Sequence, residues 1–508
     1  MSPDFDILTA TATELRGLLT SGKTTSARIV ERYLDQINQY DSELRALISV
    51  ASRENVLRIA ALLDEERARG HIRGPLHGIP IVPKDAFITA SDLGMPTTAG
   101  SWATFDAKAS KNAEIVQRLV DAGMIILAKA NMTEFAGMRT VTAMVKPGWS
   151  APGGQTLSPY VGPLEEDETL LGHSAAGGSS TGSAVAVAAG FSPLSLGTET
   201  IGSIITPAAR AALYAIKPNH GSQNPNGMFT LTDFFDSPGP MAKSAADLLL
   251  LMQVLMRETY PDIKSSWDGL SVGFLDPDVW KTGEAMCRQH EGTAEQMKQD
   301  YLDMVAMISK EGCKVKYPMT MPDVAQVAVD GKDAIMPIAF WDFKNLCIPR
   351  FLAGFDESPV RNLADIIRFH EENKEKCLPP PYNSQADLIQ ALEDSNTVDY
   401  VLSLKTRLRR EAKERLDRVF ANEGVNLIAA PSDSPLCIHA AAAGYPVATV
   451  PLGQLRYNGR PFGLCLLAKE HEEASILQFM AAYEKAVPPR PVPDLNAVRN
   501  KILEKTRS

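Results

Sequence analysis

The alternation of helix-forming and strand-forming segments is the feature that most constrains how this chain folds. Residues 113–123, AEIVQRLVDAG, place apolar side chains at helical spacing and end in glycine, and residues 124–135, MIILAKANMTEF, follow as a buried strand. Comparable strand patterns stand elsewhere in the chain: GIPIVP before this segment, and LSVGFLD, VNLIAAPSD and YPVATVPLG after it. Helix, glycine and buried strand in this order are typical of a parallel or mixed sheet. The sequence therefore predicts an α/β fold.

Helical segments account for much of the remaining chain. Residues 11–40 predict two amphipathic helices, residues 55–70 a charged helix and residues 243–257 a long apolar one. Residues 285–312 and 361–422 are also predicted to be helical, and FWDFKNLCIPRFLAGF between them is expected to cover the core rather than join the sheet. No internal repeat and no long polar linker divides the chain into separate domains.

The composition is that of a packed protein rather than a nucleic-acid or membrane binder. The 508 residues are 44% hydrophobic and 22% charged, with a formal net charge of -10. An acidic chain lacks the clustered basic surface that phosphate backbones require. The six cysteines form no C-x-x-C pair, the N-terminus has no secretory pattern, and the apolar runs are too short or too interrupted for a bilayer. We therefore expect a cytoplasmic protein with reduced thiols, without nucleic-acid binding or membrane insertion.

A phosphate-loop pattern near the N-terminus is predicted to be a coincidence. Residues 17–24, GLLTSGKT, satisfy G-x-x-x-x-G-K-[ST] letter for letter. In a true phosphate loop the pattern follows a β-strand, because the loop amides converge on phosphate between a strand and a helix. Here a helical pattern precedes it, so the segment predicts the turn of a helical hairpin.

A glycine- and serine-rich segment holds the candidate nucleophile. Residues 177–210 read GGSSTGSAVAVAAGFSPLSLGTETIGSIITPAAR, and Gly202-Ser203 stands on a sharp turn before a helix-like stretch. Unpaired amides at such a turn can bind an oxyanion formed by attack of Ser203. The G-x-S-x-G elbow is absent, and His173 and His220, the nearest histidines, are better explained by local hydrogen bonding. A Ser-His-Asp mechanism is therefore weakly supported.

Lys84 is the alternative base for such a serine. It follows the apolar strand GIPIVP and precedes Asp85, so its side chain can lie in the interior. Burial lowers the pKa of a lysine and leaves part of the amine neutral near pH 7. On its own, a lysine after a strand is more often a surface residue.

Seven segments together give the chain a resemblance to the amidase signature family. They occur in the family's order and spacing, and the resemblance spans residues 8–490. The segments are GIPIVPKDAF, AKANMTEF, GGSSTGSAVAVAAG, LGTETIGSI, YAIKPNHG, DSPGPMAKSAADL and YPVATVPLG…NGRPFGLCLLA. The resemblance implies the amidase-signature fold, a central mixed β-sheet covered by helices on both faces.

The resemblance also implies one amidase domain over residues 1–508. Its parts are N-terminal helices at 1–70, the catalytic signature core at 71–260, a variable helical covering segment at 325–420, and strands and a helix at 424–490 that return to the core.

In the family the catalytic set is Ser–Ser–Lys, with the bridging serine twenty-four residues before the nucleophile, which is the separation of Ser179 and Ser203. The resemblance implies Ser203 as nucleophile, Ser179 on a cis peptide as the bridging serine, and Lys84 as base. Ser180 is expected to cap the following helix.

Further residues complete the implied site. The oxyanion is expected to meet backbone amides of Thr200, Ile201 and Gly202, and Ala136 is expected to line the pocket, as its position does in relatives. No metal and no cofactor are expected.

The turn around Ser203 departs from the family pattern. Most relatives have Gly-Gly-Ser-Ile-Arg where this chain has Ile201-Gly202-Ser203-Ile204-Ile205, and Glu199 replaces the usual Asp. A β-branched residue resists positive φ, and loss of the arginine removes a fixed charge. These changes leave open a retuned specificity or an impaired catalyst.

The leading interpretation is a hydrolase that cleaves the C–N bond of a small-molecule carboxamide through an acyl-serine intermediate, with esters as easier acyl donors that it could also cleave. Three alternatives stay open: a glutamine-dependent amidotransferase A-type subunit, an acyl transferase, and a non-catalytic scaffold that keeps the amidase fold. Whether the chain forms a homodimer is also open.

Overall fold

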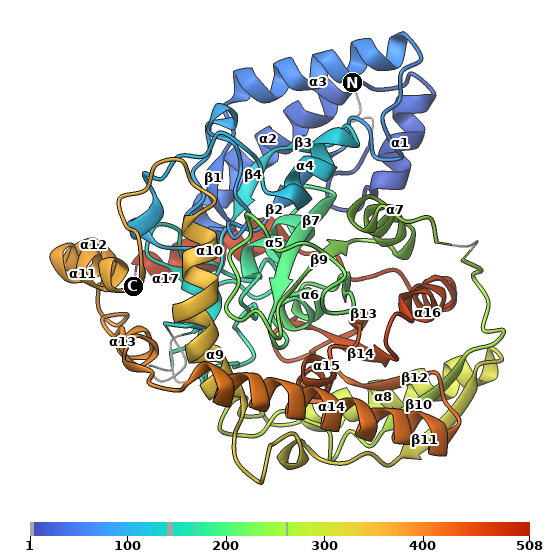
Figure 1. Cartoon of the computed structure of the whole chain (residues 1–508). Helices are drawn as coiled ribbons and strands as arrows, with labels where there is room; N and C mark the ends of the chain where they lie inside the picture. Colours follow the sequence, from blue (N-terminus) through green and yellow to red (C-terminus); the bar gives the residue numbers. More distant parts are fainter. Residues whose placement is uncertain (1–4, 140–145, 167, 261–262, 508) are drawn as a thin grey trace.

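The computed structural model describes residues 5–139, 146–166, 168–260 and 263–507. Three N-terminal helices, α1 (Ala12–Thr20), α2 (Ser26–Leu44) and α3 (Arg53–Ala68), pack at one end of the molecule (Figure 1). Thr11 caps α1 through a capping box, and Thr25 caps α2. The phosphate-loop pattern falls on the end of α1 and the turn into α2. No strand precedes this turn within the described residues, so the helical-hairpin prediction is confirmed.

A ten-stranded mixed sheet forms the centre of the molecule, in the order β11-β10-β12-β14-β13-β8-β9-β7-β2-β3. Its strands are β2 (Pro80–Pro83), β3 (Ile125–Ile126), β7 (Leu194–Glu199), β8 (Tyr214–Lys217), β9 (Ser237–Ala242), β10 (Ser271–Leu275), β11 (Lys314–Met319), β12 (Leu427–Pro431), β13 (Val447–Gln454) and β14 (Pro461–Ala468). Two small antiparallel pairs join β1 (Leu47–Val50) to β4 (Ala128–Ala130) and β5 (Trp149–Ser150) to β6 (Gly154–Gln155).

Both faces of the sheet are buried beneath helices. In β14, Leu464 and Leu466 belong to one hydrophobic cluster, and Cys465 and Leu467 belong to the other, as alternating side chains of a doubly covered strand must. The first cluster includes residues of α7 (Ala245–Met256), α8 (Thr293–Lys310) and α16 (Glu473–Ala486), and the second includes residues of α6 (Ile205–Arg210), α14 (Val398–Glu423) and α15 (Leu436–Ala443). The predicted α/β fold, with a mixed sheet covered on both faces, is confirmed.

The elements between β11 and β12 are helices that lie outside the sheet. The long helix α14 crosses the end of the molecule opposite the N-terminal helices (Figure 1). The other helices between these strands are α9 (Ile335–Asp342), α10 (Ile348–Leu352), α11 (Leu363–Glu372), α12 (Lys374–Cys377) and α13 (Ala386–Glu393), with a π-helical turn at Phe343–Cys347. The prediction of helix from residue 285 was wrong by about two turns, because α8 begins only after Gly292, whose φ is +77°.

Helix α4 (Glu114–Asp121) precedes β3, and α17 (Leu495–Arg507) packs against α2. All six cysteines are free and buried. Within the described ranges, none of the helices is both long and apolar enough to cross a membrane.

Strand direction brings separate parts of the sequence to one edge of the sheet. Strands β2 and β7 are parallel, and β7 and β8 both run antiparallel to β9. The carboxyl ends of β2, β7 and β8 therefore point the same way. In open α/β sheets, functional groups gather at such an edge.

Candidate active site

Lys84 stands directly after β2 and reaches two serines from another part of the chain. Its backbone N–H donates to the Leu196 carbonyl of β7 at 2.8 Å, which fixes where the side chain starts. The Nζ atom then donates to Ser179 Oγ at 2.8 Å, to Ser180 Oγ at 2.9 Å and to Thr198 Oγ1 at 2.9 Å. The structure thus brings together two of the three predicted catalytic residues, although they lie 95 positions apart.

The Lys84 side chain is fully buried, and burial lowers its pKa from 10.5 to about 7. The carboxyl groups of Asp236 and Glu199 act in the opposite direction and keep the pKa from falling further. Because the pKa is close to neutral pH, a large fraction of the amine carries no proton at pH 7. A neutral amine in contact with a hydroxyl can accept its proton.

Ser179 is held from both sides. The Gly178–Ser179 peptide bond is cis, as the resemblance implies. Its hydroxyl accepts a hydrogen bond from Lys84, and its carbonyl accepts one from the Thr133 backbone N–H at 3.1 Å. Ser179 is 4% exposed and therefore lies beneath the surface, in contact with Lys84.

The expected capping role of Ser180 was wrong. Ser180 does occupy the N-cap position of α5 (Thr181–Ala188), but its hydroxyl makes no capping hydrogen bond. The hydroxyl instead donates to the Thr198 carbonyl at 2.9 Å and accepts from the Thr198 N–H at 3.2 Å, besides its contact with Lys84. It therefore ties Lys84 to the end of β7. The Ser180 backbone N–H donates to the Ser203 carbonyl at 3.1 Å, which joins the two serine segments.

Ser203 lies on the turn between β7 and α6 and is 8% exposed. Gly202 takes a φ of +78°, whereas Ile201 is not among the described non-glycine residues with positive φ. Ile201 was in doubt because a β-branched residue resists positive φ, but its position does not require a left-handed backbone. The backbone N–H groups of Ile201, Gly202 and Ser203 find no acceptor within the described residues.

Glu199 fixes the far side of this turn. Its Oε2 atom accepts from the backbone N–H of Ile204 at 2.7 Å and of Ile205 at 2.9 Å. These are two of the donors that the start of α6 would otherwise leave unpaired. The carboxylate thus occupies the amides that follow Ser203 and leaves those before it unoccupied.

Ala136 sits in a backbone conformation that is unusual for a non-glycine residue. Its φ is +54°, and that of Phe135 is +48°. The Ala136 N–H donates to the Thr133 carbonyl at 2.9 Å, so this amide is already engaged. Thr133 also contacts Ser179, and Ala136 therefore lies one hydrogen-bonded turn from the serine segment.

The histidines near the serines have partners elsewhere. His173 Nδ1 lies 3.0 Å from Arg460 Nη2, and His220 Nε2 lies 3.0 Å from the Asp233 carbonyl. Burial lowers the pKa of each imidazole to about 4. The local hydrogen-bonding roles expected for both residues are confirmed. Within the described ranges, no group of three or more His, Cys, Asp or Glu side chains could hold a metal ion.

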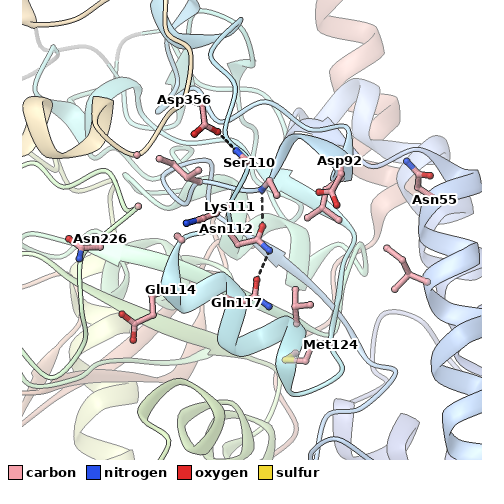
Figure 2. Close-up of a pocket in the computed structure, with 18 of the residues that line it drawn as sticks. Asn55, Asp92, Ser110, Lys111, Asn112, Glu114, Gln117, Met124, Asn226 and Asp356 are labelled. Atoms are coloured by element: carbon pink, nitrogen blue, oxygen red, sulfur yellow. Dashed lines mark hydrogen bonds between the residues drawn. The ribbon is translucent and has the colours of Figure 1, made fainter.

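A cavity of about 1030 Å³ lies apart from these residues, and Figure 2 shows its lining. Residues of α3, the start of α4 and the 353–356 segment surround it, and Asp356 accepts a hydrogen bond from the Ser110 backbone N–H there. Lys84, Ser179 and Ser203 do not line it. Cavity size therefore does not identify the candidate site, whereas the buried lysine and the serines around it do.

Comparisons with known proteins place this fold among the amide hydrolases. A family model described as Amidase matches residues 28–436, which is more than half of the chain. The chain therefore belongs to the Amidase family.

Relatives and solved structures agree with this family. A Schizosaccharomyces pombe protein named as an amidase is 29% identical over 94% of this chain and 85% of its own length. An Alcanivorax borkumensis protein named as a component of glutamyl-tRNA(Gln) amidotransferase is 28% identical over 94% of this chain and 97% of its own. Among solved structures, the peptide amidase of Stenotrophomonas maltophilia superposes with a TM-score of 0.82 at 29% identity, covering 96% of this chain and 99% of that one.

Proposed function

We propose that the chain hydrolyses a small-molecule carboxamide with Ser203 as nucleophile, Ser179 as proton relay and Lys84 as general base. The observation that carries the proposal is the 2.8 Å contact between Lys84 Nζ and Ser179 Oγ, made by a fully buried amine whose pKa is lowered to about 7. A buried titratable group with a strongly shifted pKa is typical of a functional site. No second base is needed.

The proposed reaction runs in two halves. Neutral Lys84 takes the proton of the Ser179 hydroxyl, Ser179 takes that of Ser203, and Ser203 Oγ forms a bond to the carbonyl carbon of the amide. The relay then returns a proton to the nitrogen as the C–N bond breaks, which leaves an acyl-serine and a free amine or ammonia. Water attacks the acyl-serine by the same relay, and the carboxylic acid leaves.

The turn before Ser203 is the proposed oxyanion site. Thr200, Ile201 and Gly202 supply its backbone, and unpaired N–H groups at residues 201–203 support the assignment, because preorganised donors stabilise the charge that develops in the transition state. Ala136 is proposed to line the substrate pocket with its side chain, since its N–H already binds Thr133.

The proposed substrate is an uncharged carboxamide. Ile205 replaces the arginine of most relatives and is fully buried, so this position supplies no cation to bind an acidic substrate. The solved relative from Stenotrophomonas maltophilia is named a peptide amidase, which supports a carboxamide on a peptide or another uncharged acyl group. Esters, which are easier acyl donors, are proposed as secondary substrates.

The decisive experiment combines covalent labelling with turnover. A fluorophosphonate probe should label the wild type and Ser195→Ala but not Ser203→Ala; Ser195 is a buried serine on β7 whose hydroxyl has no hydrogen-bond partner among the described residues. Ammonia release from a panel of carboxamides should follow the same pattern. Labelling of Ser203→Ala at the wild-type rate would place the nucleophile elsewhere.

The amidotransferase alternative rests on relatives that carry that name. Such a protein would release ammonia from glutamine and respond to partner chains, whereas the proposed enzyme hydrolyses other carboxamides alone. Glutamine therefore belongs in the carboxamide panel. We also propose that the whole chain acts as one amidase domain in the cytoplasm, and light scattering of the purified protein decides whether it forms a homodimer.

A further inference from the structure

A second buried lysine lies behind the turn that carries Ser203. Lys217 ends β8, which runs parallel to β7, so its side chain starts at the same edge of the sheet as the turn. It is 2% exposed, and its Nζ atom donates to the Thr200 carbonyl at 2.7 Å. Burial lowers the pKa of Lys217, while the carboxyl groups of Glu199 and Asp236 raise it. Burying an amine costs free energy unless it is hydrogen-bonded, and Lys217 makes its hydrogen bond to the turn that carries Ser203.

The position of Lys217 fixes the direction of one peptide plane. The cis bonds of the described residues do not include Thr200–Ile201, so this peptide is trans. In a trans peptide the C=O and the following N–H point in opposite directions. Because the Thr200 carbonyl points at Lys217, the Ile201 N–H points away from Lys217. That N–H is one of the unpaired donors of the turn within the described residues.

The neighbouring groups of the turn are held by other residues. The Thr200 side chain interacts with the Asp236 carboxyl group, and Glu199 holds the two amides that follow Ser203. Neither of these contacts fixes the plane between Thr200 and Ile201. The hydrogen bond from Lys217 does, and a donor at the carbonyl end of a peptide also polarises its N–H and strengthens it as a donor.

We infer that Lys217 is a positioning residue that aims and polarises the Ile201 N–H for binding the oxyanion. The inference rests on the proposed function, in which this turn stabilises the tetrahedral intermediate. Lys217 touches neither Lys84 nor a serine hydroxyl in any described hydrogen bond. Its effect is therefore on transition-state stabilisation and not on the proton relay or on substrate binding.

The test compares Lys217→Met with Lys243→Met. Lys243 is a matched control, because it is 4% exposed and donates to two main-chain carbonyls, those of Ile7 and Ala10, at 2.9 and 3.2 Å. Lys217→Met should lower kcat by about 10²-fold, the typical effect of losing one oxyanion donor, with KM within about threefold of wild type. Affinity for a trifluoromethyl ketone analogue, which forms a tetrahedral adduct, should fall by a similar factor. Lys243→Met should keep all three values.

If Lys217 only stabilised the fold, Lys217→Met would lower the melting temperature, as Lys243→Met would, and would leave kcat per folded molecule unchanged. Equal kcat in Lys217→Met and Lys243→Met would overturn the inference while leaving the nucleophile assignment intact. Turnover by Ser203→Ala would instead overturn the proposed function and the inference with it. Should Lys217→Met fail to fold, Lys217→Leu, which also lacks a hydrogen-bond donor, is measured in its place. The same loss of kcat at constant KM is expected, and a kcat equal to the control again overturns the inference.

Discussion

Replacing Lys84 with methionine should change how the stability of the protein depends on pH. Burial lowers the pKa of Lys84 from 10.5 to about 7. Between these two values the unfolded chain binds a proton at this side chain that the folded chain does not. The free energy of unfolding of the wild type therefore rises with pH in this window, by about 1.4 kcal/mol per unit from Lys84 alone. Below pH 7 both states bind the proton, and the contribution of Lys84 is flat.

Lys84→Met removes this term, so the difference between the two proteins isolates it from every other titrating group. Urea denaturation at pH 7, 8 and 9 should show the wild type gaining about 2 kcal/mol relative to Lys84→Met across that range. Hydrogen bonds lost in the variant shift the whole curve and leave the slope unchanged. The wild type should gain a similar amount of stability relative to Lys243→Met across this pH range, because burial lowers the pKa of Lys243 to about 7 as well. A difference that stays constant from pH 7 to 9 would mean that Lys84 keeps its proton in the fold and cannot act as base.

Three further outcomes follow from the geometry. The value of kcat/KM should rise with pH with a midpoint near 7, as Lys84 loses its proton, and a profile without an inflection between pH 6 and 8 would refute Lys84 as base. Gly182→Ala should lower the free energy of unfolding in urea titrations by about 1–3 kcal/mol, because the added Cβ would overlap main-chain oxygens of Ala46 and Asn131. A variant as stable as the wild type would contradict this packing. Glu199→Ala should lower the free energy of unfolding by about 2 kcal/mol or more, because it leaves two backbone amides at the start of α6 unpaired. Glu199→Gln keeps an acceptor and should be close to wild type in stability. Equal losses in both variants would argue against the capping role.

The α/β class and most helices were predictable because their signals are local. The helix–glycine–strand order at residues 113–135 fixed the class, and the Thr11 and Thr25 caps mark helix starts that can be read directly. The start of α8 was misplaced, because residues 285–292 have ordinary helix-compatible composition and Gly292 is the one strong local signal against helix there.

The meeting of Lys84 and Ser179 could not be predicted from local pattern. Which strand ends share an edge depends on the order of strands in the sheet, and spacing along the chain does not encode that order. The family resemblance supplied the pairing, and β2 lying parallel to β7 is its physical cause. Ser180 was misjudged for a related reason: the N-cap preference of serine is a local tendency, and the buried Lys84 and Thr198 outcompete it.

Lys217 was missed although its signal resembles that of Lys84. Both lysines stand at the end of a short apolar strand beside a proline, Pro83 before Lys84 and Pro218 after Lys217. The recurrence of that pattern in one chain would have been reason to place both side chains in the interior. Thr198 offered no comparable signal, since a threonine within a strand is ordinary.

The six buried cysteines make the protein convenient to study with thiol chemistry. Because every native sulfur is shielded, a maleimide reagent should find no reactive site on the folded enzyme. A single cysteine introduced on the covering helices would then carry a spin label or dye without background. Movement of that segment during turnover could thereby be followed in an otherwise unaltered chain.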